Sequence, residues 1–266
     1  MDCLLRAGSS GASSGGGSYD PTSYFTGGTS GPWYDFNNSA KILNASDTAA
    51  TNGQTIKTIQ DVNSASYDGT QGTDANRPTL VTNFANGKSA ALCDSTDLFD
   101  ATGLNAFSNA ANSITVLAVF QPTDATTNHC MFQQYDNPWG VLRAYAGSVG
   151  LQPSVRYDRD STAYGNIRSG TAASAATTHA MVIQIDALNG QTGLYLDNAT
   201  NLTMQAAGGS TVAGAFNSTN GNESVILRQC KGYCLDIYIH KNAMMDATQR
   251  GNWFTAVKAR FSLTAY

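Results

Sequence analysis

Carboxylates are the residues of this chain that could carry out acid–base chemistry, and few of them are grouped. Glu223 is the only glutamate in the 266-residue sequence, and the late apolar run 234–240 holds a single acid, Asp236. Hydrolysis of a glycosidic bond needs two carboxyl groups, about 5–5.5 Å apart in retaining enzymes and further apart in inverting ones. Because this run offers one acid where two are needed, the sequence argues against a glycan-degrading hydrolase (depolymerase). Such a hydrolase is the alternative function.

A second acidic segment, residues 156–160, reads Arg-Tyr-Asp-Arg-Asp. Asp158 and Asp160 come nearest to a carboxylate pair, but Arg156 and Arg159 accompany them in sequence. Alternating opposite charges are typical of a solvated surface segment. We interpret this segment as a solvated turn rather than as a catalytic pair.

The three histidines, His129, His179 and His240, lie outside any recognisable nucleophile motif. His129 and Cys130 are adjacent, and neighbouring side chains of an extended segment point to opposite faces, which disfavours a dyad. The sequence contains no phosphate-binding loop, no dinucleotide fingerprint and no His-Glu-x-x-His zinc motif. We therefore predict no catalytic residues and no cofactor.

Cysteines and clustered aspartates are the candidate metal ligands. The five cysteines, at positions 3, 93, 130, 230 and 234, show no repeated metal-binding spacing and are interpreted as free thiols. Cys230 and Cys234 are close enough in sequence either to form a disulfide across a tight turn or to remain a thiol pair. Asp94, Asp97 and Asp100 are clustered, but aspartate-rich turns are common without a bound metal. The sequence predicts no metal site.

One loop combines the residue types that bind sugars. A sugar site places an aromatic ring against the apolar face of the sugar and uses Asn, Asp or Arg to hydrogen-bond its hydroxyl groups. The candidate carbohydrate-binding residues are Tyr135, Asp136, Asn137 and Trp139 of this loop, together with Tyr157 outside it. The competing interpretation is that Trp139 anchors its loop on the hydrophobic core.

Many short strands are expected to position these side chains. Residues 113–120 form a continuous β-branched and aromatic run that ends before Pro122, which predicts a buried strand. Further short apolar runs, separated by Gly, Asn, Asp and Pro, follow at roughly even spacing as far as residue 198. This pattern predicts an all-β, antiparallel sandwich.

The last forty residues change period. In residues 234–240 aliphatic residues alternate with Asp236, Tyr238 and His240, which predicts a strand buried on one face only. Apolar residues between 246 and 261 fit one face of a helix, and Asp246 followed by Gln249 predicts a capping box. We expect one short helix to follow the last strand.

This ending resembles that of the concanavalin A-like lectin/glucanase (laminin-G-like) superfamily, particularly its branch in bacteriophage virion structural proteins. Members commonly close with an acid inside an apolar strand, here Asp236, and a short helix that contains arginine, here Arg250. An opening aromatic strand with Trp33 and a turn at Arg77 and Pro78 also follow the order of the family. The resemblance implies an antiparallel β-sandwich of the concanavalin A-like jelly-roll type.

The resemblance covers about residues 32–262, and it specifies fold better than activity. Gln60 stands where the family often has tryptophan. The family's glucanases keep their acids close together on one strand, in a pattern such as Glu-x-Asp-x-x-Glu. Because Asp236 is the only acid of the corresponding strand, the resemblance implies a member that is not an enzyme.

The composition excludes some partners. Charged residues make up 13% of the chain, about half the usual quarter, and the net charge is −4. Uncharged polar side chains lose less free energy than Lys or Glu when they are buried at a protein contact, which suits a densely assembled protein. No basic field attracts nucleic acid, no apolar run approaches the ~20 residues of a membrane span, and no secretory signal is visible at the start.

Residues 8–18 are nearly all Gly or Ser, which predicts a flexible segment. We divide the chain into an N-terminal arm, residues 1–31, which anchors it to an assembly, and a sandwich domain, residues 32–266. An arm of ~20 extended residues reaches about 60 Å, far enough to hold neighbouring subunits together. The predicted function is a non-catalytic bacteriophage virion structural protein of the tail, fibre or capsid decoration. We expect it to contact other virion proteins through the arm, to form a homo-oligomer in the particle and to expose a lectin-like domain to host surface glycans.

Overall fold

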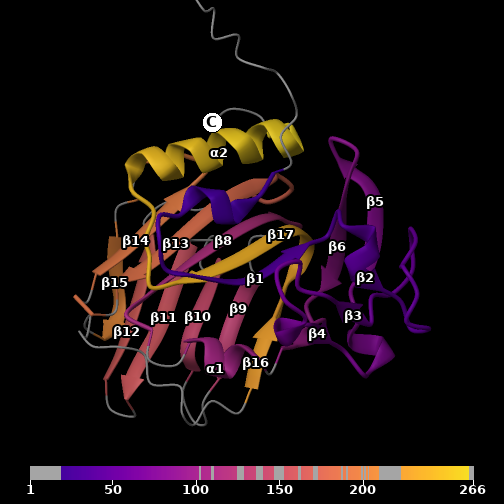
Figure 1. The fold of residues 1–266 in the computed structure, drawn as a ribbon, viewed down its shortest axis with the longest axis horizontal. Coiled ribbons are helices and arrows are strands. Elements are labelled where there is room, and N and C mark those ends of the chain that lie inside the picture. The colour runs from indigo at the N-terminus through magenta and orange to yellow at the C-terminus, as the bar shows by residue number, and fades with distance from the viewer. Residues whose placement is uncertain are drawn as a thin grey trace, which may run out of the picture.

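The described part of the molecule consists mainly of two antiparallel β-sheets and one C-terminal helix (Figure 1). The structure, a computed structural model, describes residues 19–101, 103–108, 111–124, 129–135, 140–146, 153–160, 163–169, 173–186, 188–189, 191–198, 200, 202, 204–209 and 223–263. The predicted all-β sandwich with a short C-terminal helix is confirmed.

The first sheet has seven of the described strands, in the order β14-β13-β8-β17-β6-β5, with β1 paired to β17. Their bounds are β1 Thr29–Asp35, β5 Thr79–Ala85, β6 Lys88–Asp94, β8 Ser113–Pro122, β13 His179–Asp186, β14 Gln191–Leu196 and β17 Lys231–Lys241. The predicted strand at residues 113–120 is β8, a central strand on which all but one residue is buried. Its β-branched run fits a sheet that is covered on both faces.

The second sheet has ten of the described strands, in the order β15-β12-β11-β10-β9-β16-β7-β4-β3-β2. Their bounds are β2 Ile42–Leu43, β3 Thr58–Ile59, β4 Gly69–Thr70, β7 Phe99–Asp100, β9 His129–Tyr135, β10 Gly140–Ala146, β11 Pro153–Asp160, β12 Ala163–Ser169, β15 Met204–Gly209 and β16 Glu223–Ile226. The interpretation of residues 156–160 as a turn is wrong. Asp158 pairs with Tyr164 and Asp160 with Ala163, so the charged segment is the end of a strand, and the pairing register shifts between the two aspartates.

The C-terminal helix is the longest of the described helices, and it has 15 residues. The described ones are η1 Pro21–Tyr24, η2 Ser39–Lys41, η3 Ala65–Tyr67, η4 Asp74–Asn76, α1 Leu104–Ser108 and α2 Ala247–Phe261. The predicted capping box of α2 is confirmed: Asp246 accepts a hydrogen bond from Gln249 N at 2.8 Å, and the Gln249 side chain accepts one from Asp246 N at 2.8 Å. No helix in the described part of the chain is long and apolar enough to span a membrane.

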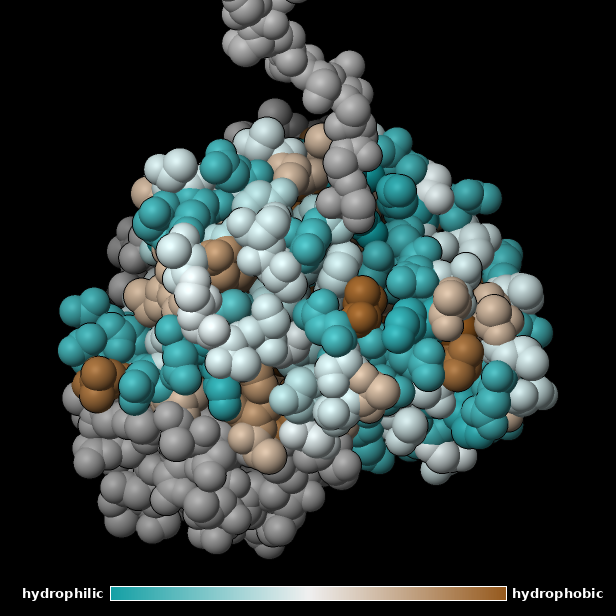
Figure 2. Space-filling model, viewed as in Figure 1, coloured by the Kyte–Doolittle hydropathy of each residue, from teal (hydrophilic) through white to brown (hydrophobic). Residues whose placement is uncertain are grey.

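The seven-stranded sheet separates two hydrophobic cores. One core lies between the sheets and includes Val116, Phe132 and Ile183. The other lies under α2, where Trp253 and Val257 pack with residues of β8, β13 and β17. Figure 1 shows α2 lying across this outer face of the sheet. The described residues on the face that Figure 2 shows are mainly hydrophilic. Leu188 and Met244 are the large hydrophobic residues that are exposed among those described.

The prediction that the last strand is buried on one face only is wrong. Asp236, Tyr238 and His240 are as buried as the aliphatic residues between them, because α2 and residues 19–28 cover the second face of β17. The pairing register with β8 shifts between Cys234 and Asp236. At this bulge Leu235 joins the core under α2, while Ile237 joins the core between the sheets.

Residues 19–31, which the sequence assigned to the arm, pack on the sandwich. Tyr19 accepts a hydrogen bond from Trp253 Nε1 at 3.0 Å. The Phe25 ring stacks on His240, with the ring centres 3.9 Å apart. Residues 19–28 therefore form a strap across β17 beside α2, and the strap leads into β1.

Candidate functional site

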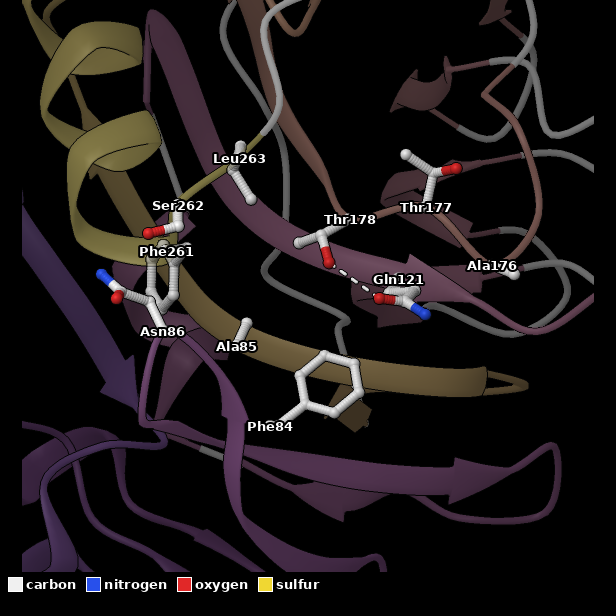
Figure 3. A pocket seen from close by; sticks show the side chains of 10 residues that line it. All are labelled: Phe84, Ala85, Asn86, Gln121, Ala176, Thr177, Thr178, Phe261, Ser262 and Leu263. Atoms are coloured by element: carbon white, nitrogen blue, oxygen red, sulfur yellow. Dashed lines mark hydrogen bonds between the residues drawn. The ribbon is translucent and has the colours of Figure 1, made fainter.

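An open pocket lies on the α2 side of the seven-stranded sheet, where four segments meet (Figure 3). Its volume is about 550 Å³. The β5–β6 turn, the end of β8, the loop before β13 and the C-terminal end of α2 contribute its walls. The lining residues are Phe84, Ala85, Asn86, Gln121, Ala176, Thr177, Thr178, Phe261, Ser262 and Leu263. We call it the α2 pocket.

The β5–β6 turn forms one wall and is tied to α2. Asn86 and Gly87 have φ values of 52° and 69°, as the two-residue turn of a tight hairpin requires. This turn directs the Asn86 side chain towards the helix, where Nδ2 donates to Ala259 O at 3.3 Å and to Arg260 O at 2.9 Å. These are carbonyl groups of the last turn of α2, which have no partner inside the helix. Asn86 therefore fixes the helix end and the hairpin relative to each other.

The pocket combines an apolar wall with polar groups. The Phe84 ring stacks on Tyr233, with centres 4.0 Å apart and planes 23° apart. Tyr233 pairs with Gln121 in the sheet, and Gln121 Oε1 accepts a hydrogen bond from Thr178 Oγ1 at 2.8 Å (Figure 3). Among the described residues the Gln121 amide nitrogen has no partner, so it remains a donor for a bound molecule.

The loop before β13 is held in place by a buried His–Asp pair. His179 Nδ1 lies 2.7 Å from Asp197 Oδ2, and Ala180 N donates to Asp197 Oδ1 at 2.9 Å. The other imidazole nitrogen, Nε2, lies 3.1 Å from Ser174 N and 2.9 Å from Ser174 O. Ser174, His179 and Asp197 thus resemble a Ser-His-Asp triad in composition, and the Ser174 hydroxyl lies 3.4 Å from the same nitrogen. However, the main chain of Ser174 occupies the nitrogen that a catalytic base would use, so the group anchors residues 174–178 beside the pocket.

Sequence reasoning missed this anchor. His179 begins β13 and Asp197 directly follows β14, and an antiparallel hairpin brings these two ends together. A polar pair at the open end of a predicted hairpin is the signal that could have found it.

The carboxylate on which the hydrolase alternative rests is buried away from the pocket. Asp236 is 2% exposed and accepts a hydrogen bond from Trp33 Nε1 at 2.8 Å. Burial, and then the charge of Asp35, hold the pKa of Asp236 well above its ordinary value. Asp35 itself receives two hydrogen bonds from Arg260 Nη2, each 2.8 Å. The Arg260–Asp35 ion pair attaches α2 to the sheet. Asp236, the acid of the closing strand, therefore has a structural role in this network.

Of the sugar-binding residues predicted from the sequence, Tyr135 and Tyr157 lie on strands of the other sheet. Asp136, Asn137 and Trp139 are outside the described residues. Tyr135 ends β9 and Tyr157 lies in β11, while their side chains are outside the description. Leu142 pairs with both Gln134 and Tyr157, so the backbone brings the two tyrosines to one end of three adjacent strands. The prediction about their role stays a prediction.

The candidate metal ligands serve as loop and core residues. Asp97 Oδ2 accepts from Asp94 N at 2.9 Å, and burial raises the pKa of Asp97 to about 6. Cys93, Cys230 and Cys234 are buried and form no disulfide, so the alternative of a Cys230–Cys234 disulfide is not what the structure has. No group of three or more His, Cys, Asp or Glu side chains suited to a metal ion occurs in the part of the chain that is described.

Comparison with known proteins supports the fold. No protein-family profile and no curated protein matches the sequence. Domain 4 of AbnA, an extracellular GH43 arabinanase from Geobacillus stearothermophilus in complex with arabinotriose, aligns with a TM-score of 0.53 and 16% identity over 86% of this chain and 99% of that chain. A GH54 α-L-arabinofuranosidase soaked with a cyclic sulfate inhibitor has a TM-score of 0.53 and 12% identity over 86% of this chain and 62% of its own. At these identities the similarity shows the fold alone, which is a β-sandwich.

Proposed function

We propose that this chain is a non-catalytic glycan-binding protein whose β-sandwich is carried on a bacteriophage particle, as part of the tail, a fibre or the capsid decoration. The observation that supports glycan binding best is the chemistry of the α2 pocket. Its lining residues supply an aromatic ring, amides and hydroxyl groups, and none of them is ionisable. Such a surface binds uncharged, hydroxyl-rich molecules and offers no general acid or base.

The pocket suits the two faces of a sugar. Phe84, held by its stack on Tyr233, offers an apolar surface to the C–H face of a pyranose or furanose ring. Gln121 Nε2 is free to donate to a hydroxyl group, and Thr177 and Ser262 each add a hydroxyl at the rim. The walls are fixed before any ligand binds, by Asn86 on α2 and by His179 on Asp197. A fixed wall reduces the entropy cost of binding.

The carboxylates of the described residues support a non-catalytic role. A glycosidase needs an acid that reaches the scissile bond, whereas Asp236 lies under α2 and Asp35 is paired with Arg260. The hydrolase alternative predicts cleavage of a polysaccharide that Asp236→Asn abolishes. Our proposal predicts that neither the wild type nor the Asp236→Asn variant releases reducing ends from a polysaccharide.

The proposed virion role rests on the low charge and on the Gly/Ser-rich segment. A host surface glycan is then the proposed ligand, and contacts with other virion proteins are assigned to the N-terminal segment. Homo-oligomerisation in the particle is part of the same proposal.

A glycan array tests the binding proposal. The purified chain is probed against bacterial surface glycans and arabinotriose, the latter because domain 4 of AbnA was solved with it. We expect binding that Gln121→Ala weakens about tenfold, since it removes a donor and the support of Thr178. Trp139→Ala is the matched variant for the sugar-binding residues that the sequence predicts, and loss of binding in this variant alone would move the site to residues 135–157. Absence of binding to any glycan would refute the proposal.

A further inference from the structure

A row of half-buried side chains crosses the seven-stranded sheet and runs into the α2 pocket. Its members lie opposite one another in the pairing register, and a hydrogen bond between Gln121 and Thr178 extends it to the loop before β13 (Figure 3). The pairs are Thr55 with Thr79, Thr79 with Leu92, Leu92 with Tyr233, and Tyr233 with Gln121. We call the row, which consists of Thr55, Thr79, Leu92, Tyr233, Gln121 and Thr178, the cross-strand row.

The cross-strand row faces the α2 side of the sheet. The residues next to its sheet members in the chain all belong to the core between the two sheets, and they are Ile56, Leu80, Cys93, Cys234 and Phe120. Successive side chains of an extended strand point to opposite faces. The row members therefore point away from that core.

Helix α2 and the strap leave the cross-strand row partly open. On β17 the outward residues Leu235, Tyr238 and His240 are buried, whereas Tyr233 is only half-buried. Leu92, opposite Tyr233, is half-buried as well. The covered part of the outer face thus ends before the row, and the row borders solvent.

The chemistry of the row matches that of the α2 pocket. None of its side chains is charged at neutral pH. Leu92 and Tyr233 form an apolar and aromatic middle, with threonine hydroxyl groups on one side and an amide and a hydroxyl group on the other. Charges appear only in the next row, where the exposed residues Lys231 and Asp94 are paired. Apolar surface flanked by hydroxyl and amide groups suits a sugar chain, which has C–H faces and hydroxyl edges.

The row is continuous with the pocket and extends well beyond it. Gln121 and Thr178 belong to both, and the Phe84 ring of the pocket stacks on Tyr233 with the ring centres 4.0 Å apart. Paired strands lie ~4.8 Å apart, so the four spacings from Thr55 to Gln121 amount to about 19 Å. This distance is longer than one sugar ring. A ligand that fills the pocket can therefore continue along the row.

We infer that the α2 pocket and the cross-strand row together bind a linear, neutral oligosaccharide that runs across the strands. One terminal sugar occupies the pocket, the next packs its C–H face on Tyr233 and Leu92, and the hydroxyl groups of Thr79 and Thr55 bind the far end. The inference rests on the proposed function, because it assigns the class of glycan to the same site.

Calorimetric titration of the full chain tests the inference with matched neutral sugars. The probes are glucose with maltotriose, mannose with mannotriose, and N-acetylglucosamine with its trimer. We expect at least one trisaccharide to bind, and to bind at least tenfold more tightly than its monosaccharide, because only the longer chain reaches the row.

Two variants separate the row from the pocket. Thr79→Val keeps the shape and removes a hydroxyl group at the far end. We expect it to bind the trisaccharide about three- to tenfold more weakly, with unchanged affinity for the monosaccharide and unchanged thermal stability. Gln121→Ala should weaken the binding of both. Thr70→Val, at an exposed position in β4 of the other sheet, is the matched control and should change neither.

Equal affinity for a trisaccharide and its monosaccharide would overturn the inference and leave the proposed function standing. Wild-type binding of the trisaccharide by Thr79→Val would do the same. Absence of saturable binding by every trisaccharide would also overturn the inference, and binding of another glycan on the array would then still support the proposed function.

Discussion

Single residues of this chain illustrate what sequence patterns reveal and what they leave out. The scarcity of paired acids was visible in the sequence. In the structure the one acid of the closing strand, Asp236, is buried and accepts a hydrogen bond from Trp33. Gln121 and Phe84 could not be identified as pocket residues from the sequence. Amides and aromatics are common in β-proteins, and only the fold shows which of them meet. Tyr135 and Tyr157 were easier to single out in the sequence as sugar-binding candidates. Their side chains are not among those described, so this prediction is not tested.

The raised pKa of Asp97 predicts a pH dependence of stability. The folded-state pKa, about 6, lies above the ordinary value of 3.8, so the folded state binds the proton more tightly than the unfolded state. The stability from this group is complete below about pH 4 and is lost as the pH rises to about 6. Asp97→Asn keeps an acceptor for Asp94 N and removes the charge.

We expect the free energy of unfolding of Asp97→Asn, relative to the wild type, to rise by about 1 kcal/mol between about pH 4 and pH 7. This is less than the ~3 kcal/mol of two pKa units because solvent screens part of the charge. Urea unfolding at both pH values measures it. A difference that does not change with pH would show that the Asp97 carboxyl titrates normally.

At the scale of elements, features that depend on residues close in sequence were predicted correctly, and features that depend on long-range contacts were not. The capping box of α2 and the β-branched run of β8 depend on residues within a few positions of one another, and both predictions are confirmed. The strap of residues 19–28 and the bulge in β17 were missed. They depend on contacts such as Tyr19 with Trp253, 234 positions apart, which no local periodicity contains.

Helix α2 is predicted to be stabilised mainly by its buried face. Trp253 is completely buried between the sheet and the strap. Trp253→Ala should lower the free energy of unfolding by about 3–5 kcal/mol, through lost burial and the cavity that remains. The exposed Thr255 on the same helix is the control, and Thr255→Ala should change stability by less than about 0.5 kcal/mol. Equal effects of the two substitutions would contradict the packing of α2 on the sheet.

The strap is predicted to loosen in acid. His240 lies against Phe25, its Nδ1 is 2.7 Å from the Tyr238 hydroxyl, and its Nε2 is 2.9 Å from Gly27 O. Burial lowers the pKa of His240 below 6.5. Since the folded state favours the neutral ring, its contribution is complete above about pH 6.5 and is lost as the pH falls through the lowered pKa.

Replacing His240 tests this loss. His240→Gln should be less stable than the wild type at about pH 7, and its stability should fall less steeply towards about pH 5, because the variant has no imidazole to charge. Unfolding by urea at several pH values gives both slopes. Identical slopes for the two proteins would show that His240 does not cause the loss of stability in acid. Other groups, such as His129, would then cause it.

At the scale of the whole molecule, the sandwich was predictable because its signals are distributed along the chain. Even strand spacing, one late helix and low charge each favour the same class, and two solved structures with TM-scores of 0.53 share the fold. Function was less predictable, because structures that are only 12–16% identical share the sandwich, and at such identities a similarity shows the fold alone. The deciding chemistry lies in pockets assembled from distant segments.

The proposed place of the chain in a particle gives a prediction at this scale. Because residues 19–28 pack on the sandwich, the deletion that tests the arm removes residues 1–18 and leaves the strap intact. We expect a soluble domain with unchanged thermal stability that no longer enters particles. Incorporation at the wild-type level, measured by immunoblot of purified particles, would refute the role of the arm.

The central claim is that the α2 pocket binds a neutral glycan without cleaving it. The most direct measurement is an NMR titration of the full chain with the glycan that binds best on the array, following side-chain amide signals. We predict saturable shifts of the Gln121 and Asn86 side chains, an unchanged Asn189 side chain, and an intact glycan at the end. Shifts confined to residues 135–157, or release of shorter saccharides, would contradict the claim.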